Sequence, residues 1–423
     1  MREMKDSGIE WVGQIPFFWD VKPIRAKFRE VTEKNKLGIE KNALKFTYGN
    51  IVKKDNFDAA DDDYVANTIL NYMVVNPGTI MLNGLNLNFD FVTQRVALVK
   101  ERGIITSAYI AVAPILDDDI STQFFTYLLK AYDSCKAFHN MGGGVRKILN
   151  FAELKKQYIV YPTITEQKRI ANFLDAKCAE IDALTADIQT QIDTLEQYKR
   201  SIITETVTKG LNPDVEMKDS GVFYMAPMNA KWRLTKIGYI CTKLSRLFKP
   251  EDTALICSNS GKVLVRPDDV TGKMVSDDNA MQGIHAGDIA IHGMDTWHGA
   301  IALSDYDGKI TRVVHVCDST EDKRFIVYYL QHLAFQGVYK LISNGVRGNT
   351  SDFRSWDKVR DIWIAIPKTK EEQKNICDYL DRQCKSIEKV IAEKKEQIEV
   401  LDEYKKSLIY EYVTGKKEVP ENA

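Results

Sequence analysis

The chain contains 423 residues, of which 44% are hydrophobic and 28% are charged, and its formal net charge is -1. This length exceeds what one ordinary hydrophobic core supports, so two domains are expected, and the composition excludes a disordered or low-complexity protein. The near-neutral charge also excludes a protein that binds polyanions through bulk charge. Any nucleic-acid site must therefore come from local clusters of side chains.

The first residues carry no apolar signal segment, and no apolar run approaches the ~20 residues that cross a bilayer. The seven cysteines form no CxxC pair, and their odd number leaves no complete disulfide framework. We therefore expect a cytoplasmic protein in a reducing compartment.

The chain opens with a pentapeptide, MKDSG, at residues 4–8 that recurs unchanged at residues 217–221. At the same offset of 213 residues, Trp19 matches Trp232 and Ile24 matches Ile237. A gapless match that continues through a tryptophan indicates an internal duplication.

Each opening leads into a globular segment that mixes short Val/Ile-rich runs with one helical run, STQFFTYLLKAY in the first and DKRFIVYYLQHL in the second. This pattern predicts an α+β fold for both segments. The two segments share only short similar stretches, such as NPGTIML at residues 76–82 and HAGDIAI at residues 285–291. The two domains are therefore expected to share a scaffold and to differ in surface.

The loops after these stretches are the best candidates for contact with a ligand, because Asn and His can hydrogen-bond base edges. Asn83 matches His292 in position, Asn86 matches Asp295 and Asn88 matches Trp297. Arginines in two glycine-rich GVR motifs suit phosphate or guanine contacts. The candidate DNA-binding residues are Tyr48, Asn50, Lys53, Lys54, Asn83, Asn86, Asn88, Arg146, Lys147, Ser258, Asn259, Lys262, Arg266, His292, Asp295, Trp297, His298 and Arg347. Turn formation and ordinary surface exposure explain many of them about as well.

A second duplication follows each domain, at residues 165–208 and 371–414, and pairs without gaps at an offset of 206 residues. Both blocks lack Gly and Pro and begin shortly after a proline, Pro162 or Pro367, which predicts two long helices. Apolar residues recur every seven positions, which is typical of a coiled coil. The predicted seam comprises Leu174, Ile181, Leu184, Ile188, Leu195, Tyr198 and Ile202, then Leu380, Ile387, Ile391, Ile398, Leu401, Tyr404 and Leu408.

Lys394 interrupts the second seam, and Ile391 and Ile398 are interpreted as a neighbouring stripe. A heptad helix in one chain commonly forms a homodimer. Two matched helices in one chain instead favour intramolecular pairing, because their effective concentration is high. A whole domain separates the helices, so we predict an antiparallel pair with pseudo-twofold symmetry.

Motifs for catalysis are not found. The sequence contains no GxxxxGK[ST] phosphate loop and no Asn/Asp-Pro-Pro-aromatic tetrad of amino-methyltransferases. Asp214, Glu216 and Lys218 superficially resemble the acidic residues and lysine of a metal-dependent nuclease. Four histidines, at positions 285, 292, 298 and 315, lack cysteine partners at ligand spacing, so no metal site is predicted.

The duplicated openings MKDSGIEWVGQIPFFWDV and MKDSGVFYMAPMNAKWRL, and the helix entries PTITEQKRIANFLD and PKTKEEQKNICDYLD, resemble recurring segments of the specificity subunits of type I restriction-modification systems. The resemblance runs along the whole chain in order. It implies two target-recognition domains, residues 1–162 and 214–367, with conserved helices at 163–213 and 368–417 and a tail at 418–423.

The resemblance also implies a non-catalytic subunit that reads an asymmetric bipartite site in double-stranded DNA. The expected partners are two modification subunits, which methylate adenine, and restriction subunits. S-adenosylmethionine, ATP and magnesium are expected on those partners, with no cofactor on this chain. Two alternatives stay open: a coiled-coil scaffold whose domains bind proteins, and a self-contained nuclease using Asp214, Glu216 and Lys218.

Overall fold

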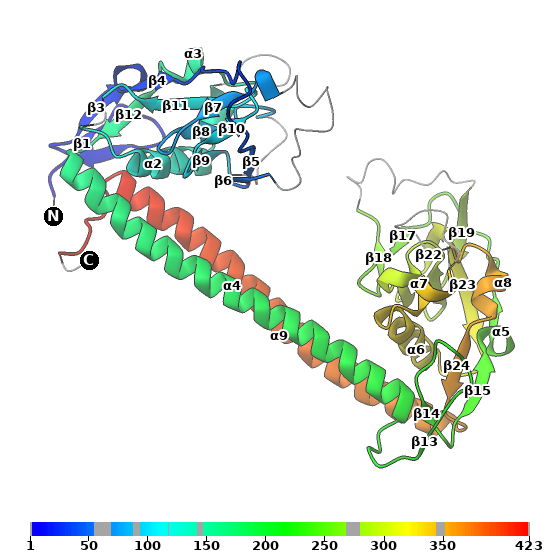
Figure 1. Ribbon diagram of the computed structural model, residues 1–423. Coiled ribbons are helices and arrows are strands. Elements are labelled where there is room, and N and C mark those ends of the chain that lie inside the picture. Colours follow the sequence, from blue (N-terminus) through cyan, green and yellow to red (C-terminus); the bar gives the residue numbers. More distant parts are fainter. Residues whose placement is uncertain are drawn as a thin grey trace. The chain divides into compact units, whose positions relative to one another are not determined.

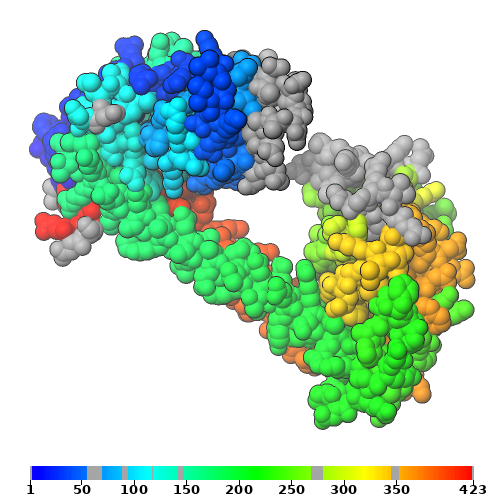
Figure 2. Space-filling model, in the orientation of Figure 1, coloured from blue at the N-terminus to red at the C-terminus, as the bar shows by residue number. Residues whose placement is uncertain are grey.

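The structure is a computed structural model that describes residues 2–54, 69–87, 94–116, 118–141, 147–267, 280–343 and 352–421. The chain forms two compact units (Figures 1 and 2): unit 1 comprises Met1–Ile188 and Glu396–Ala423, and unit 2 comprises Gln189–Lys395. Each unit contains one α+β domain and parts of both long helices, α4 (Ile164–Lys209) and α9 (Lys370–Val413).

Unit 1 is built on a four-stranded antiparallel sheet in the order β4-β11-β8-β9. Three two-stranded pairs flank it, β1-β2, β3-β12 and β7-β10, together with the hairpin β5-β6. The strands are β1 (Met4–Asp6), β2 (Gln14–Pro16), β3 (Asp20–Pro23), β4 (Phe28–Glu30), β5 (Leu44–Thr47), β6 (Asn50–Lys53), β7 (Met73–Val75), β8 (Ile80–Leu82), β9 (Val96–Leu98), β10 (Gly103–Ile105), β11 (Ile110–Pro114) and β12 (Tyr158–Tyr161). The helices of the domain are η1 (Ile24–Ala26), α2 (Thr122–Ser134), η2 (Ala137–Asn140) and α3 (Phe151–Leu154).

Unit 2 repeats this plan, with the sheet β16-β23-β20-β21 and the pairs β13-β14 and β15-β24, and adds a second four-stranded sheet, β18-β17-β22-β19. The strands are β13 (Met217–Lys218), β14 (Met228–Asn229), β15 (Arg233–Lys236), β16 (Cys241–Lys243), β17 (Ala254–Cys257), β18 (Val263–Val265), β19 (Met281–Ile284), β20 (Ile289–His292), β21 (Ile301–Leu303), β22 (Gly308–Thr311), β23 (Val314–Ser319) and β24 (Trp363–Ile366). The helices are α5 (Ile237–Ile240), η4 (Thr296–His298), α6 (Lys323–Phe335), α7 (Val338–Ile342) and α8 (Trp356–Arg360).

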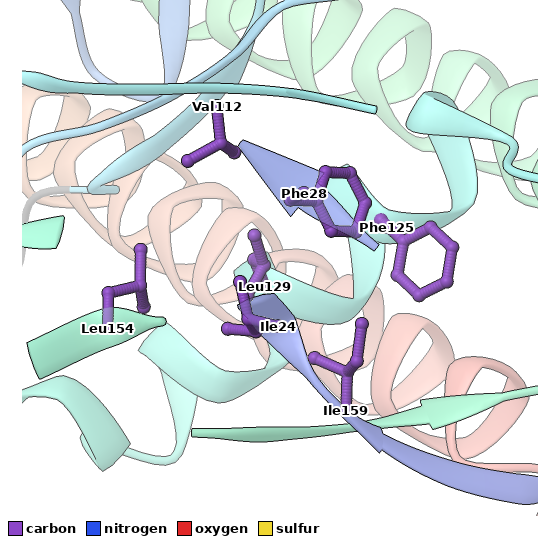
Figure 3. Close-up of a pocket in the computed structure, with 7 residues that line it drawn as sticks. All are labelled: Ile24, Phe28, Val112, Phe125, Leu129, Leu154 and Ile159. Carbon is purple, nitrogen blue, oxygen red and sulfur yellow. The ribbon is translucent and has the colours of Figure 1, made fainter. Parts of the chain in front are cut away.

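The core of unit 1 lies where α2 packs on the sheet, next to α4 (Figure 1). The apolar face of α2 buries Phe124, Phe125 and Leu128 completely, because three- and four-residue spacing places them on one side of the helix. A void of about 10 Å³ remains in this core (Figure 3). Its seven lining side chains are all apolar, so it is a packing defect that offers a ligand no polar partner.

Each domain is joined to its long helix by the same buried contacts. In unit 1 the Trp19 indole N–H donates to Glu166 Oε2 at 2.8 Å, and Gln167 Oε1 accepts the Ser121 backbone N–H at 2.8 Å. In unit 2, Trp232 donates to Glu372 Oε1 at 2.9 Å, and Gln373 Oε1 accepts the Asp322 N–H at 2.9 Å. Ser121 and Asp322 are the N-caps of α2 and α6, so each glutamine joins its long helix to the core helix of the domain. The tryptophan contacts join the duplicated opening of each domain to the duplicated long helix.

The long helices run antiparallel within each unit. In unit 1, Phe173 packs on Tyr412 with ring centroids 4.6 Å apart, and Lys405 Nζ lies 2.6 Å from Asp182 Oδ1. In unit 2, Lys199 pairs with Glu388, the residues that match Lys405 and Asp182 at the offset of 206. The predicted fold class is confirmed: two α+β domains with two long helices in an antiparallel, intramolecular, pseudo-twofold coiled coil.

The predicted seam needs one correction. Leu184 is 48% exposed, and Tyr198 and Tyr404 are each 55% exposed, so these three lie off the buried stripe. The second row of the first seam falls four residues after the first row instead of three, at Cys178, Thr185, Ile192 and Lys199. Sequence favoured the more apolar three-residue step, but packing against the partner helix selects the four-residue one.

The remaining predicted seam residues are buried or half-buried: Leu174, Ile181, Ile188, Leu195, Ile202, Leu380, Ile387, Ile391, Ile398, Leu401 and Leu408. Ile391 and Ile398 belong to the same four-residue row in α9, together with Cys384 and Lys405, so they are not a displaced stripe. Lys394 is half-buried on the first row and donates a hydrogen bond to Gln191.

Replacing Lys394 with leucine should stabilise unit 2. The substitution puts an apolar side chain on a half-buried seam position, and the expected gain in unfolding free energy is about 1 kcal/mol. Urea unfolding followed by circular dichroism measures it, with Lys395→Leu, at an exposed neighbour, as the control. Equal stability of the two variants would show that the seam tolerates the lysine at no cost.

A buried histidine should make unit 2 sensitive to acid. His332 in α6 is 4% exposed, its Nδ1 hydrogen-bonds the Thr204 hydroxyl of α4 at 3.1 Å, and burial lowers its pKa to about 4 from 6.5. Between these two pH values the unfolded chain binds a proton that the folded chain does not. Stability should therefore fall as the pH drops from 6.5 towards 4, by roughly 3 kcal/mol in total.

Thermal unfolding at a series of pH values measures this loss, and His332→Gln should flatten the slope. An unchanged slope in that variant would mean that other groups cause the acid sensitivity.

Candidate nucleic-acid interface

The candidate loops leave equivalent inner strands of the two sheets. Residues 83–87 follow β8, which lies between β11 and β9, and residues 293–298 follow β20, which lies between β23 and β21. An inner strand is held on both sides, so the loop that follows it starts from a fixed point. Loops placed in this way on a rigid scaffold commonly carry binding residues.

Each loop pairs with the segment that follows a GVR motif. In unit 1 the Leu149 N–H donates to the Gly84 carbonyl at 2.9 Å, and the Leu87 N–H donates to the Lys147 carbonyl at 3.1 Å. In unit 2 the Phe353 N–H donates to the Gly293 carbonyl at 2.9 Å. In unit 1 the structure thus brings the candidate Lys147 next to the loop at residues 83–87.

Glycine is required at these contacts because the backbones approach closely. A Cβ on Gly84 would lie 2.3 Å from the Leu149 carbonyl oxygen, and one on Gly293 would lie 2.8 Å from the Phe353 carbonyl oxygen. Both distances are shorter than van der Waals contact allows. The matching Gly84 and Gly293 are therefore part of the common framework.

The side chain of the residue at the start of each loop hydrogen-bonds the backbone of that loop. Asn83 Oδ1 accepts the Leu85 N–H at 3.1 Å, and His292 Nδ1 accepts the Asp295 N–H at 3.1 Å. Burial lowers the pKa of His292, although the nearby Asp295 carboxylate opposes this shift, so the imidazole is a neutral acceptor. These two side chains shape their loops, whereas Asn86 and His298 are exposed and available to a ligand.

In unit 1 the β5-β6 hairpin carries further candidates. Tyr48 and Gly49 form its two-residue turn with φ of 44° and 73°, as a type I′ turn requires. Tyr48 is 73% exposed, and Asn50, Lys53 and Lys54 are exposed as well. Gly49 packs against the side chain of Gln94, two residues before β9.

In unit 2 the β17-β18 hairpin lies over α6 and α9. Lys262 Nζ donates to Glu388 Oε2 at 2.8 Å, and a groove of about 380 Å³ separates the hairpin turn from the helices. Asn259 is exposed, Ser258 bonds Ser260 at 2.7 Å, and Arg266 is half-buried. Lys262 is thus partly neutralised by the coiled coil.

The other candidates have mixed surroundings. Trp297 is half-buried, with Lys340 Nζ 5.0 Å from its ring centroid, and Asp295 lies 3.2 Å from the His292 ring. Lys147 is exposed with a φ of 36°. Asn88, Arg146 and Arg347 lie outside the described residues.

Two residues at these loops were missed by sequence reasoning. Arg95 sends its guanidinium to the loop at residues 83–87, and Lys340 lies against Trp297. Arg95 directly precedes an apolar strand, and nothing in such a pattern distinguishes a buried arginine from a surface one. Only the pairing of distant segments could reveal either residue.

Within the described residues, no group of three or more His, Cys, Asp or Glu side chains could hold a metal ion. His285 pairs with Asp307 at 3.2 Å, and His315 is buried with Nε2 2.7 Å from the Phe353 carbonyl. Asp214, Glu216 and Lys218 are exposed around the link between α4 and β13. None of the helices in the described part of the chain is long and apolar enough to cross a membrane.

Comparison with known proteins gives one family match and several similar folds. Residues 23–194 match the family model of the type I restriction modification DNA specificity domain. A chain from a structure on complex assembly and conformational transition of the type I R-M system is similar over 95% of this chain and 99% of that one, with a TM-score of 0.66. At 12% identity, this likeness shows a shared fold.

Two further solved structures are similar over most of their length. The HsdS subunit from Thermoanaerobacter tengcongensis has 14% identity and a TM-score of 0.44, with 95% of this chain and 98% of that chain covered. The type I S subunit from M. genitalium has 14% identity and a TM-score of 0.38, with 93% and 96% covered. No curated protein matches the sequence.

The fold and the family match define a DNA sequence-specificity protein. The match over residues 23–194 and the shared fold support the predicted resemblance to the specificity subunits of type I restriction-modification systems.

Adding a methyl group at either loop glycine should open the corresponding loop. Gly84→Ala is expected to release the hydrogen bonds of residues 147–149 and to destabilise unit 1 by about 1–3 kcal/mol, because a backbone atom must move. Hydrogen exchange at the Leu149 amide measures this release. Gly293→Ala should act in the same way on the Phe353 amide and leave Leu149 protected, so each variant is the control for the other.

Proposed function

We propose that this chain reads an asymmetric, bipartite site in double-stranded DNA, one half-site with each unit. The proposal rests on one observation: the same framework occurs twice, and the loops after β8 and β20 differ in their exposed side chains. The anchors Trp19–Glu166 and Trp232–Glu372 are equivalent, whereas Asn86 in one loop corresponds to Asp295 in the other. Equivalent scaffolds with different exposed side chains suit two half-sites of different sequence.

The chemistry belongs to partner subunits in this proposal. Two modification subunits would methylate adenine with S-adenosylmethionine, and restriction subunits would use ATP and magnesium. A related structure concerns complex assembly of the type I R-M system, which supports such partners for this chain. The near-neutral net charge supports sharing of the phosphate contacts with them.

Adenine-methylation mapping tests the proposal. DNA is exposed to the modification subunit with and without this chain and is sequenced by a long-read method that detects methyladenine. A split, asymmetric motif should appear only when the chain is present. Identical maps, obtained with a folded complex and an active methyltransferase, would reject the proposal and favour the protein-binding scaffold.

Paired variants sharpen this test. Asn86→Ala should change base preference in one half of the motif and His298→Ala in the other, because these exposed side chains belong to different units. Each lost base contact should reduce discrimination by roughly 10-fold. Changes in the same half by both variants would contradict the assignment of one half-site to each unit. Magnesium-dependent cutting by the pure chain would instead support the nuclease alternative.

A further inference from the structure

The loop at residues 83–87 is held from inside the protein by a buried arginine. Arg95 is 1% exposed, and its Nη1 donates to the carbonyls of Asn83 at 3.0 Å and Leu85 at 2.8 Å. Its Nη2 donates to the Asn86 carbonyl at 3.4 Å. One planar guanidinium therefore contacts three carbonyls of a single short loop.

The backbone of Arg95 is fixed as well. Its carbonyl accepts the Asn83 N–H at 2.8 Å, and its own N–H donates to Asp133 Oδ2 of α2 at 2.8 Å. Asp133 is 9% exposed; burial raises the pKa of this carboxyl, whereas the Arg95 N–H and charge act to lower it. The arginine thus connects the loop to the core helix of unit 1.

Other contacts of the loop hold Gly84, Leu85 and Leu87, whereas Asn86 is held through its carbonyl by Arg95. Asn86 adopts a φ of 50°, which is uncommon for a residue other than glycine, and its exposed side chain is a candidate for base contact. Rotation of this one residue would point the amide in another direction. The hydrogen bond from Arg95 to the Asn86 carbonyl acts directly on that residue.

Unit 2 uses a different device. Ala300 stands at the position that matches Arg95, because its carbonyl accepts the His292 N–H at 2.9 Å just as the Arg95 carbonyl accepts the Asn83 N–H. The methyl side chain of Ala300 cannot hydrogen-bond the loop. The loop of unit 2 is instead ordered by the His292 imidazole, which accepts the Asp295 N–H. A change at Arg95 should therefore reach one unit and leave the other unaltered.

We propose that Arg95 is a positioning residue that sets the base preference of the half-site read by unit 1 without touching the DNA. This inference rests on the proposed function. The guanidinium holds the carbonyls of residues 83, 85 and 86, and so directs the Asn86 side chain towards one arrangement of base-edge donors and acceptors. Lysine cannot replace it fully, because a single ammonium group lacks the planar fork that spans several acceptors.

Methylation mapping with the full chain and its modification subunit tests this role in Arg95→Lys and Arg95→Met. We expect preference at one or more base pairs of a single half-site to fall by about 10-fold in Arg95→Met and by less in Arg95→Lys. The other half-site should keep its sequence. Loss of folded complex would lower methylation at all sites equally, so a change in preference confined to one half is not a stability effect.

Two further variants complete the design. Asp133→Asn keeps an acceptor for the Arg95 N–H but removes the charge, so it should relax the same base pairs even if Arg95→Met fails to fold. Arg102→Met is the matched control: Arg102 lies in the same unit, is 54% exposed and bonds Glu40 and Asn76, away from the loop. It should leave both half-sites unchanged.

Unaltered base preference in both Arg95→Lys and Asp133→Asn would overturn the inference, and so would equal relaxation of both half-sites. Hydrogen exchange on the intact chain separates this failure from failure of the proposed function. Faster exchange of the Leu85 and Leu87 amides in Arg95→Met would show that Arg95 positions the loop. If the methylation map of the wild-type chain also lacked a split motif, the role of Arg95 in the loop would stand and bipartite reading of DNA would be rejected.

Discussion

The hydrogen bond from a buried tryptophan indole to a glutamate in the first turn of a long helix is the contact on which the rest of this structure depends. It occurs twice, as Trp19–Glu166 and Trp232–Glu372, and each time a neighbouring glutamine accepts the backbone N–H of the residue that caps the core helix of the same domain. Because both hydrogen bonds lie in a part-buried interface, loss of the donor or the acceptor leaves the other polar group without its partner. The duplicated segments are therefore conserved within the chain as matched pairs.

Variation is confined to places where these contacts are not needed. The loops after β8 and β20 begin at equivalent positions and share a glycine that meets a neighbouring backbone, but their exposed side chains differ. A scaffold that tolerates such differences can present two unlike surfaces, as recognition of an asymmetric DNA site requires. The near-neutral charge of the chain fits a division of labour in which base reading and phosphate affinity need not come from the same subunit.

The supports beneath the two loops differ as much as the loops themselves. In unit 1 a buried arginine holds three carbonyls, and in unit 2 a half-buried histidine accepts two backbone N–H groups, those of Met294 and Asp295. Burial of a cation without hydrogen-bond partners is costly, so the three carbonyl contacts of Arg95 disfavour other shapes of its loop. Under the proposed function, half-site preference would then reside partly in residues that never reach the DNA.

The sequence by itself determined the duplication, the two long helices and the family, because identities at constant offsets survive in the chain without knowledge of contacts. It could not decide which of two heptad rows faces the partner helix, since Leu184 and Tyr198 are more apolar than Thr185 and Lys199 but lie outside the stripe. It also could not show that Asn83 and His292 turn inward or that Arg95 is buried. These properties depend on contacts between segments distant in sequence, and only the tertiary structure specifies them.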